Sequence, residues 1–245
     1  MGASDGEVVV RWMELGSPSA ATLARWWTVL DADERARAGR FHFESDRVTY
    51  VAAHAMTRAL LAGVGDLSAH EWRFVAGPQG KPEIDPALGT RLRFNMSHTS
   101  GLVAAAVCLD HDVGVDVEAC DSSGAAMEVV DRCLAPSEVA RLNEVPVAER
   151  LATFLRYWTL KEAYLKATGT GLDRPLDSFA FTLDPVRISF GPDVTDDGEQ
   201  WQFHQHRPTS RHILAIALHR PTRQPATVIA RAAAAEGHDG SPSLA

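Results

Sequence analysis

The feature of this sequence that most restricts its fold is an order of predicted elements that occurs twice. Apolar residues that alternate with polar ones predict strands, and apolar residues that recur every three or four positions predict helices. In both halves of the chain a strand comes first, helices follow and further strands end the unit. The strands are predicted at residues 7–13, 91–96 and 102–109 and again at 113–118, 178–183, 186–190, 201–206 and 212–219, and the helices at 20–30 and 47–62 and again at 123–134, 137–143 and 149–168.

This repeat predicts an α+β fold of two pseudo-symmetric subdomains, each a small antiparallel sheet packed with helices, with the functional site in the cleft between them. Residues 1–112 would form the N-terminal subdomain and residues 113–220 the C-terminal one. Residues 221–245, rich in alanine and then in glycine, serine and proline, are expected to form a flexible tail. The segments that align within the repeat are residues 57–65 with 161–169 and residues 100–107 with 211–218.

The composition excludes several function classes. The 245 residues carry a formal net charge of −8, whereas a nucleic-acid surface needs a basic stripe. Cys108, Cys120 and Cys133 follow neither zinc-ligand nor disulfide-framework spacing, which favours a reducing compartment. The first residues lack a signal-peptide pattern, and the longest uncharged apolar run, 101–109, is too short to span a bilayer. We therefore expect a cytoplasmic protein that binds neither nucleic acid nor membrane.

A strictly alternating strand carries two acidic residues. Residues 113–118 read Val-Gly-Val-Asp-Val-Glu, so the valines share one face while Gly114, Asp116 and Glu118 share the other. Residues two apart on a strand lie roughly 6–7 Å apart at Cα, which lets both carboxylates reach one cation, and such oxygen ligands suit Mg2+. An edge strand with its acidic side chains in water explains the pattern equally well.

The predicted helix 149–168 carries a second acidic candidate. Glu162 and Lys166 are four residues apart and share a helix face. A surface ion pair explains that spacing without any function. If the strand carboxylates lie nearby, Glu162 could instead bind the same cation and Lys166 a phosphate.

Two polar segments add candidates for phosphate or nucleotide binding. Gly80, Lys81 and Pro82 follow a Gly-Pro turn and could present a cation to a nucleotide, although such triplets are commonly only turns. Ser97 and His98 place a hydroxyl and an imidazole at a strand end, where a structural histidine is the alternative.

Taken in order along the chain, these pieces resemble the surfactin-synthetase-type 4'-phosphopantetheinyl transferase family. The resemblance covers roughly residues 10–220, and its most specific part is a Gly-x-Asp-x-Glu strand followed about forty residues later by Trp-x-x-Lys-Glu-Ala-x-x-Lys. The segments that carry it are residues 80–82, 94–99, 114–118 and 158–166.

The resemblance implies a monomer with coenzyme A bound between its two halves. It implies that Asp116, Glu118 and Glu162 hold Mg2+, with Mn2+ as the alternative, and that Glu162 and Lys166 are catalytic. The coenzyme contacts that it implies are Lys161, Lys166 and His98 for phosphates, with Ser97 nearby, and Gly80, Lys81 and Pro82 for the adenine side. Arg58, which aligns with Glu162, would meet the 3'-phosphate, assisted by Arg35, Arg37 or Arg40.

The implied activity moves phosphopantetheine from coenzyme A to a serine of an apo carrier protein and releases 3',5'-ADP. The carrier would be an acyl, peptidyl or aryl carrier of a fatty-acid, polyketide or nonribosomal-peptide synthase, as in secondary metabolite biosynthesis. Two alternatives remain from the sequence: a non-catalytic module of the same fold that binds coenzyme A or the carrier, and a magnesium-dependent nucleotide hydrolase. A binding module has no need of three metal-ligand carboxylates.

Overall fold

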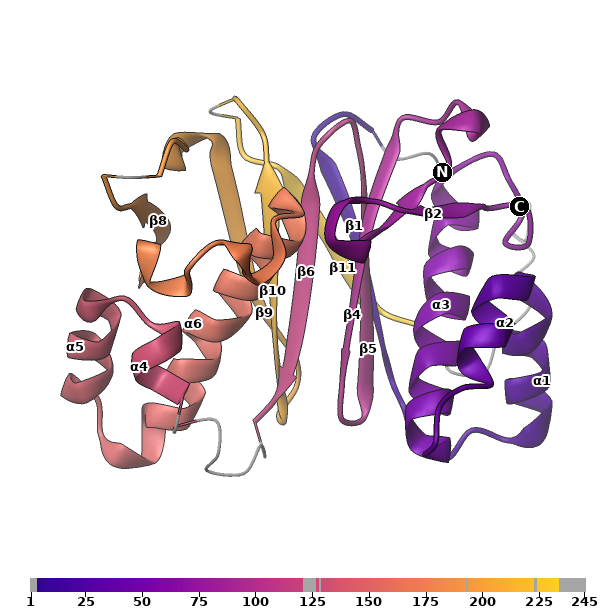
Figure 1. The fold of residues 1–245 in the computed structure, drawn as a ribbon, viewed down its shortest axis with the longest axis horizontal. Coiled ribbons are helices and arrows are strands. Elements are labelled where there is room, and N and C mark those ends of the chain that lie inside the picture. Colours follow the sequence, from indigo (N-terminus) through magenta and orange to yellow (C-terminus); the bar gives the residue numbers. More distant parts are fainter. Residues whose placement is uncertain (1–3, 121–126, 128, 193, 223, 234–245) are drawn as a thin grey trace, which may run out of the picture.

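The computed structural model describes residues 4–120, 127, 129–192, 194–222 and 224–233 (Figure 1). The helices are α1 (Ala20–Val29), α2 (Ala32–Ala38), α3 (Glu44–Val64), α4 (Val130–Cys133), α5 (Pro136–Glu144) and α6 (Val147–Thr168). The strands are β1 (Glu7–Glu14), β2 (Phe74–Ala76), β3 (Pro82–Ile84), β4 (Leu92–Thr99), β5 (Leu102–Leu109), β6 (Val113–Ala119), β7 (Phe179–Leu183), β8 (Val186–Phe190), β9 (Trp201–Thr209), β10 (His212–His219) and β11 (Thr227–Ala232).

The two larger sheets repeat one topology. In the first, β5 lies between β1 and β4, and in the second, β10 lies between β6 and β9, with antiparallel pairing throughout these strands. The hairpins β2–β3 and β7–β8 form smaller antiparallel sheets. The α+β fold predicted from the sequence is thereby confirmed. We call the part up to β5 the N-terminal half and the part from β6 to β10 the C-terminal half.

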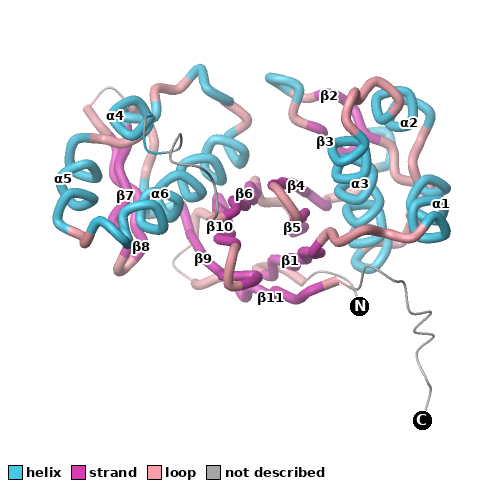
Figure 2. Tube along the Cα trace, turned by 90° about the horizontal axis from the view of Figure 1, so that it is seen from below, coloured by secondary structure: helices cyan, strands magenta, loops and turns pink. Residues whose placement is uncertain are grey.

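The elements stack in layers, with the two sheets in the middle and helices outside (Figures 1 and 2). One apolar cluster packs α3 against β5, through residues such as Leu61 and Val103. A second packs α6 against β10, through residues such as Tyr164 and Ala215. A third fills the space between the sheets. Each sheet therefore buries both of its faces.

Strand β6 keeps the alternation that its sequence predicts. Its three valines belong to the cluster between the sheets, and its other face lies against α6. A Cβ on Gly114 would lie 1.9 Å from the carbonyl oxygen of Ala163, so only glycine lets α6 approach this strand so closely. The close approach brings the functional face of α6 next to the acidic face of β6.

The structure differs from the sequence predictions at the two ends of the second half. We expected a helix over residues 123–134, but α4 begins at Val130, and residues 121–126 and 128 lie outside the described residues. We also expected residues 221–245 to be flexible, but Thr227–Ala232 forms β11, which pairs in parallel with β1, and residues 223 and 234–245 lie outside the described residues. The open edge of β1 offers hydrogen-bonding groups that this segment satisfies. No described helix combines the length and apolar character needed to cross a membrane.

Candidate active site

Asp116 presents one bound and one free carboxylate oxygen at the boundary of the halves. Its side chain is buried on β6, and Oδ1 accepts hydrogen bonds from Lys166 Nζ at 2.6 Å and from Ser97 Oγ at 3.0 Å. Oδ2 is buried and has no hydrogen-bond partner among the described residues. A buried carboxylate oxygen without a donor is costly, so this atom is suited to a cation.

Glu118 lies two residues along the same strand and is held from both sides. Trp158 on α6 donates its indole N–H to Oε1 at 3.1 Å, and Thr99 at the end of β4 donates its hydroxyl to Oε2 at 3.2 Å. Burial, and then the negative charge of Asp116, raises the pKa of Glu118. Each oxygen keeps a lone pair for a further partner.

Glu162 on α6 faces these two carboxylates. Burial raises the pKa of Glu162, and the negative charges of Asp116 and Glu118 raise it further, while the Lys166 ammonium opposes them. Among the described residues, no group of three or more His, Cys, Asp or Glu side chains is arranged as a ready-made metal site. The oxygen donors, their mutual repulsion and the unpartnered Oδ2 of Asp116 nevertheless fit a divalent cation such as Mg2+.

A pocket of about 270 Å³, which Glu162 lines, lies between residues of the two halves. Its walls include Gly80 and Lys81 from the β2–β3 connection, Pro82 at the start of β3, and Glu162 and Lys166 from α6. The structure thus brings five predicted site residues into one pocket. On the same side of the molecule, Gln79 Nε2 donates to Asp173 Oδ2 at 2.5 Å and Lys81 Nζ donates to the Ala167 carbonyl at 3.4 Å, which ties the β2–β3 connection to the end of α6.

Ser97 and His98 point to opposite faces of β4. Ser97 is 6% exposed and contacts Asp116 and Lys166 rather than the pocket. His98 is exposed, and desolvation, followed by the positive charge of Lys166, lowers its pKa. His98 does not line the pocket, and its contact with a phosphate remains a prediction.

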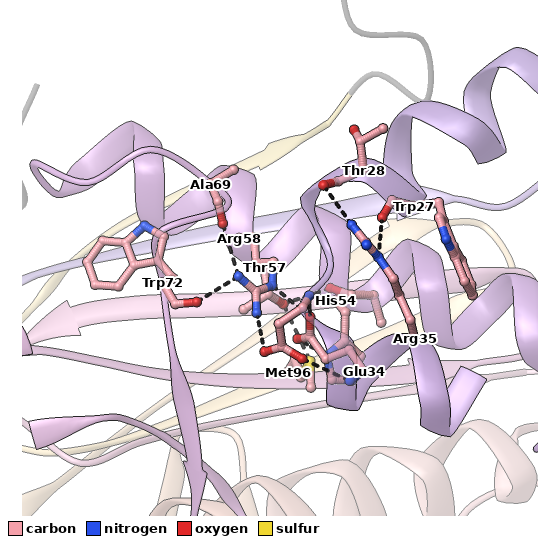
Figure 3. A network of polar contacts seen from close by, with 12 residues as sticks. Trp27, Thr28, Glu34, Arg35, His54, Thr57, Arg58, Ala69, Trp72 and Met96 are labelled. Atoms are coloured by element: carbon pink, nitrogen blue, oxygen red, sulfur yellow. Dashed lines mark hydrogen bonds and ion pairs between the residues drawn. The ribbon is translucent and has the colours of Figure 1, made fainter. Parts of the chain in front are cut away.

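The structure does not place Arg58 where a ligand could reach it (Figure 3). The side chain is fully buried in α3, where Nε binds Glu34 at 2.8 Å and Nη1 donates to the carbonyl of Trp72 at 2.7 Å. The remaining donors bind Asp31 and the carbonyl of Ala69. The prediction of a 3'-phosphate contact is wrong in this structure because the guanidinium already has protein partners.

The phosphate contact predicted for Lys161 is also wrong in this structure, because its donors already have protein partners. Its ammonium is fully buried, 2.8 Å from Glu138 Oε2, and donates to the carbonyls of Leu176 and Phe179 at 2.7 Å each. An ammonium has three donors, and all three are used. Lys161 therefore stabilises the interior of the C-terminal half and does not contact a phosphate.

The two predicted arginines of α2 have different surroundings. Arg35 donates to the carbonyls of Trp27 and Thr28 at 3.1 Å each, which closes the end of α1 (Figure 3). Arg37 lines a second pocket, of about 240 Å³, with its guanidinium 5.8 Å from the ring centre of Tyr50. This second pocket shares Gly80, Pro82 and Met96 with the first, so the two adjoin. Arg37 remains a candidate for the 3'-phosphate, whereas Arg35 has its donors engaged elsewhere.

Thr99 and Trp158 both donate to Glu118, and neither contact was predicted from the sequence. The alternation in residues 95–99 places Asn95, Ser97 and Thr99 on one face of the strand, and this signal could have shown that all three face the acidic strand. Trp158 lies one turn before Glu162 on the same helix, so its position also followed from the spacing.

The comparison with protein families identifies the class of protein that this fold and site define. A model of the 4'-phosphopantetheinyl transferase superfamily matches residues 112–217, and a model of the 4'-phosphopantetheinyl transferase N-terminal region matches residues 14–109. The chain belongs to the 4'-phosphopantetheinyl transferase superfamily, as its sequence motifs predicted.

Individual relatives agree with this family. The chain is 30% identical to the 4'-phosphopantetheinyl transferase HetI of Nostoc sp. over 190 residues, which cover 77% of this chain and 78% of that protein. It is 25% identical to the human L-aminoadipate-semialdehyde dehydrogenase-phosphopantetheinyl transferase and 27% identical to the Xenopus laevis one, over 86% and 85% of this chain and 75% and 76% of those proteins. The chain is accordingly a phosphopantetheinyl transferase, and the family to which it belongs transfers phosphopantetheine from coenzyme A to carrier proteins.

Proposed function

We propose that this chain is a magnesium-dependent enzyme of the surfactin-synthetase type, which transfers phosphopantetheine from coenzyme A to a serine of an apo acyl, peptidyl or aryl carrier protein. The observation that carries the proposal is the buried, unpartnered Oδ2 of Asp116 beside Glu118 and Glu162, whose pKa values are raised by burial and by the neighbouring carboxylates. Three acids that repel one another beside a pocket lined by lysines favour a bound cation together with a phosphate ligand.

Asp116, Glu118 and Glu162 would hold Mg2+, or Mn2+ in its place. When bound, the cation would neutralise and orient the pyrophosphate of coenzyme A. The first pocket would receive the pyrophosphate beside Lys166 and Lys81, and the adjoining pocket would receive the adenosine end, with Arg37 at the 3'-phosphate. His98 lines neither pocket and would meet a phosphate only at their margin.

The chain's own residues would move the proton and balance the charge. Glu162 would accept the proton of the carrier serine hydroxyl, because its side chain lines the pocket in which the phosphoryl group would be transferred. The serine oxygen would form a bond to the phosphorus that bears pantetheine, the bond from that phosphorus to the bridging oxygen would break, and 3',5'-ADP would leave. Lys166 would balance the charge on the transferred group.

Glu162→Gln and Asp116→Ala should each lower transfer of a fluorescent coenzyme A analogue to an apo carrier by at least about a thousandfold, because each removes a metal ligand and Glu162→Gln also removes the base. Mass spectrometry would record the carrier and the released 3',5'-ADP, and circular dichroism would check folding. EDTA should stop transfer, and added Mg2+ or Mn2+ should restore it. Full activity in either folded variant would refute the site.

The same assay distinguishes the two alternatives. A non-catalytic binding module would retain coenzyme A without modifying any carrier, and a hydrolase would release pantetheine phosphate in the absence of a carrier. A panel of apo carriers from fatty-acid, polyketide and nonribosomal-peptide synthases, read by mass shift, would identify the carrier class. We expect the enzyme to act as a monomer in the cytoplasm.

A further inference from the structure

The two halves meet along β4 and β6 through side chains. These strands belong to different sheets, so the backbone groups of β6 that face β4 need other partners. Asn95 Oδ1 accepts the backbone N–H of Val115 at 2.9 Å, and Ser97 Oγ accepts that of Val117 at 3.4 Å. Alternate side chains of β4 therefore replace a backbone ladder along the acidic strand.

The same alternate residues also bind the carboxylates. Ser97 donates its hydroxyl to Asp116, and Thr99, two residues on, donates its hydroxyl to Glu118. From the other side, Lys166 binds Asp116 and Trp158 binds Glu118. Each carboxylate thus has one donor from β4 of the N-terminal half and one from α6 of the C-terminal half.

Ser97 has no capacity left for a ligand. A hydroxyl has one donor and two acceptor sites. The donor binds Asp116, and the acceptors receive Lys166 Nζ at 2.9 Å and the backbone N–H of Val117. The phosphate contact predicted from the sequence would have to break one of these bonds.

We propose that Ser97 and Thr99 are positioning residues, which fix the orientation of Asp116 and Glu118 from the opposite half of the molecule. This inference rests on the proposed metal-dependent function. Removing partners that orient metal ligands typically costs tenfold to a hundredfold in metal affinity or activity. The arrangement makes the metal site depend on how the two halves are aligned, although all three acidic side chains come from one half.

Thr99 offers a matched pair of variants. Thr99→Val keeps the shape and removes the hydroxyl, while Thr99→Ser keeps the hydroxyl and removes a methyl group. Thr182→Val is the control, because Thr182 is exposed on β7 and its hydroxyl donates to the carbonyl of Pro185, away from the candidate site. Mn2+ binding to the coenzyme-free chain, followed by electron paramagnetic resonance, gives a readout besides activity, and steady-state transfer at several Mn2+ concentrations gives the second.

Thr99→Val should weaken Mn2+ binding about tenfold and raise by a similar factor the Mn2+ concentration that gives half-maximal transfer. Excess Mn2+ should then restore most of kcat, with little change in the KM for coenzyme A. Thr99→Ser should stay within about twofold of the unmodified chain, as the control should. A folded Ser97→Ala variant should show the same loss of Mn2+ affinity. If Ser97→Ala does not fold, the result for Thr99→Val alone tests the proposal.

The outcomes separate this inference from the proposed function. If the unmodified chain binds Mn2+ and modifies a carrier while Thr99→Val matches it in both assays, the positioning role is refuted and the enzyme remains. A Thr99→Val variant that only loses thermal stability, with unchanged Mn2+ affinity, also refutes it. If the unmodified chain neither binds Mn2+ nor modifies a carrier, the proposed function itself fails.

Discussion

Strands β1 and β6 occupy the same place in the two sheets but use it differently. Each pairs antiparallel with the central strand of its sheet. The residues that correspond on the helix-facing side are Val9, Arg11 and Met13 in β1 and Gly114, Asp116 and Glu118 in β6. Val9 and Met13 fill the core below α3, whereas the glycine of β6 admits α6 and its acids form the candidate site. The same position in the two sheets therefore contributes core packing in the N-terminal half and the carboxylates of the candidate active site in the C-terminal half.

A second comparison concerns the buried ion pairs of the halves. Glu34 and Glu138 are each the third residue of a short helix, each accepts the backbone N–H that precedes that helix, and each binds a cation from the long helix. Glu34 binds Arg58, and Glu138 binds Lys161. Arg58 is therefore the structural counterpart of Lys161. The alignment of residues 57–65 with 161–169 paired it with Glu162, so that alignment is shifted by one residue. That shift explains why Arg58 lies in the core.

The largest effect should come from breaking the pair in the C-terminal half. Lys161→Met leaves Glu138 charged in a site where both side chains are fully buried, so we expect a loss of about 3–5 kcal/mol in the free energy of unfolding. Arg58→Met should cost less, because Glu34 keeps its bond to His54 and Asp31 is 37% exposed. Urea denaturation of both variants measures the difference. Equal losses would show that the two pairs are equivalent.

A glycine exchange should act in opposite directions in the two halves. Gly114→Ala forces a methyl group into the backbone of α6 and should cost about 1–3 kcal/mol, with a loss of transfer activity. Gly63→Ala on α3 meets no atom within 4 Å and should stabilise the chain by up to about 1 kcal/mol, because alanine favours the helix. Urea midpoints check both. A neutral Gly114→Ala would contradict the close packing of α6 on β6.

Substitutions of the two arginines of α2 should have different effects, with Arg35→Ala lowering stability and Arg37→Ala weakening coenzyme A binding. Arg35→Ala removes two hydrogen bonds at the end of α1 and should cost about 0.5–1.5 kcal/mol per bond, without changing the KM for coenzyme A. Arg37→Ala should raise that KM about tenfold, since a charged contact to phosphate is worth about 1.5–3 kcal/mol. Steady-state kinetics with coenzyme A and with its 3'-dephospho form provide the check. Equal defects with both substrates would remove Arg37 from the 3'-phosphate.

The smallest effect should be a pH dependence of the free energy of unfolding that comes from Glu162 in the C-terminal half. The folded pKa of Glu162 lies above its ordinary value of 4.5, so its neutral form contributes stability that is fully present below that value and is lost as pH rises through the folded pKa. Glu162→Gln lacks this loss. In the presence of EDTA, the unfolding free energy of the Glu162→Gln variant should therefore increase relative to that of the unmodified chain as the pH rises from 4.5 towards neutrality. Parallel pH curves for the two proteins would contradict the shift.

The short-range patterns of the sequence predicted the strand and the helix that carry the candidate site. The alternation of β6, the four-residue spacing of Glu162 and Lys166, and the long helix that carries them agree with the structure. These features depend on neighbours along the chain, which a single sequence displays directly. The family resemblance then indicated that strand and helix come together, which periodicity alone left open.

The errors at the candidate site and at the chain end concern contacts between distant residues. Glu138 and Lys161 are 23 positions apart, and no local pattern distinguishes a lysine that binds a buried glutamate from one that binds a phosphate. Strand β11 was missed because its edge pairing with β1 depends on a partner more than two hundred residues away. Thr99 and Trp158 were overlooked since their role appears only when β4, β6 and α6 meet.

Strand β11 makes the two halves of this chain hard to divide. It follows the last strand of the C-terminal half but completes the sheet of the N-terminal half, where it covers the edge of β1. A fragment cut after β5 would leave the outer edge of β1 bare, and bare edges recruit strands from other molecules. Such a fragment should aggregate when produced alone, and adding the 227–232 segment to it through a linker should restore a single soluble species.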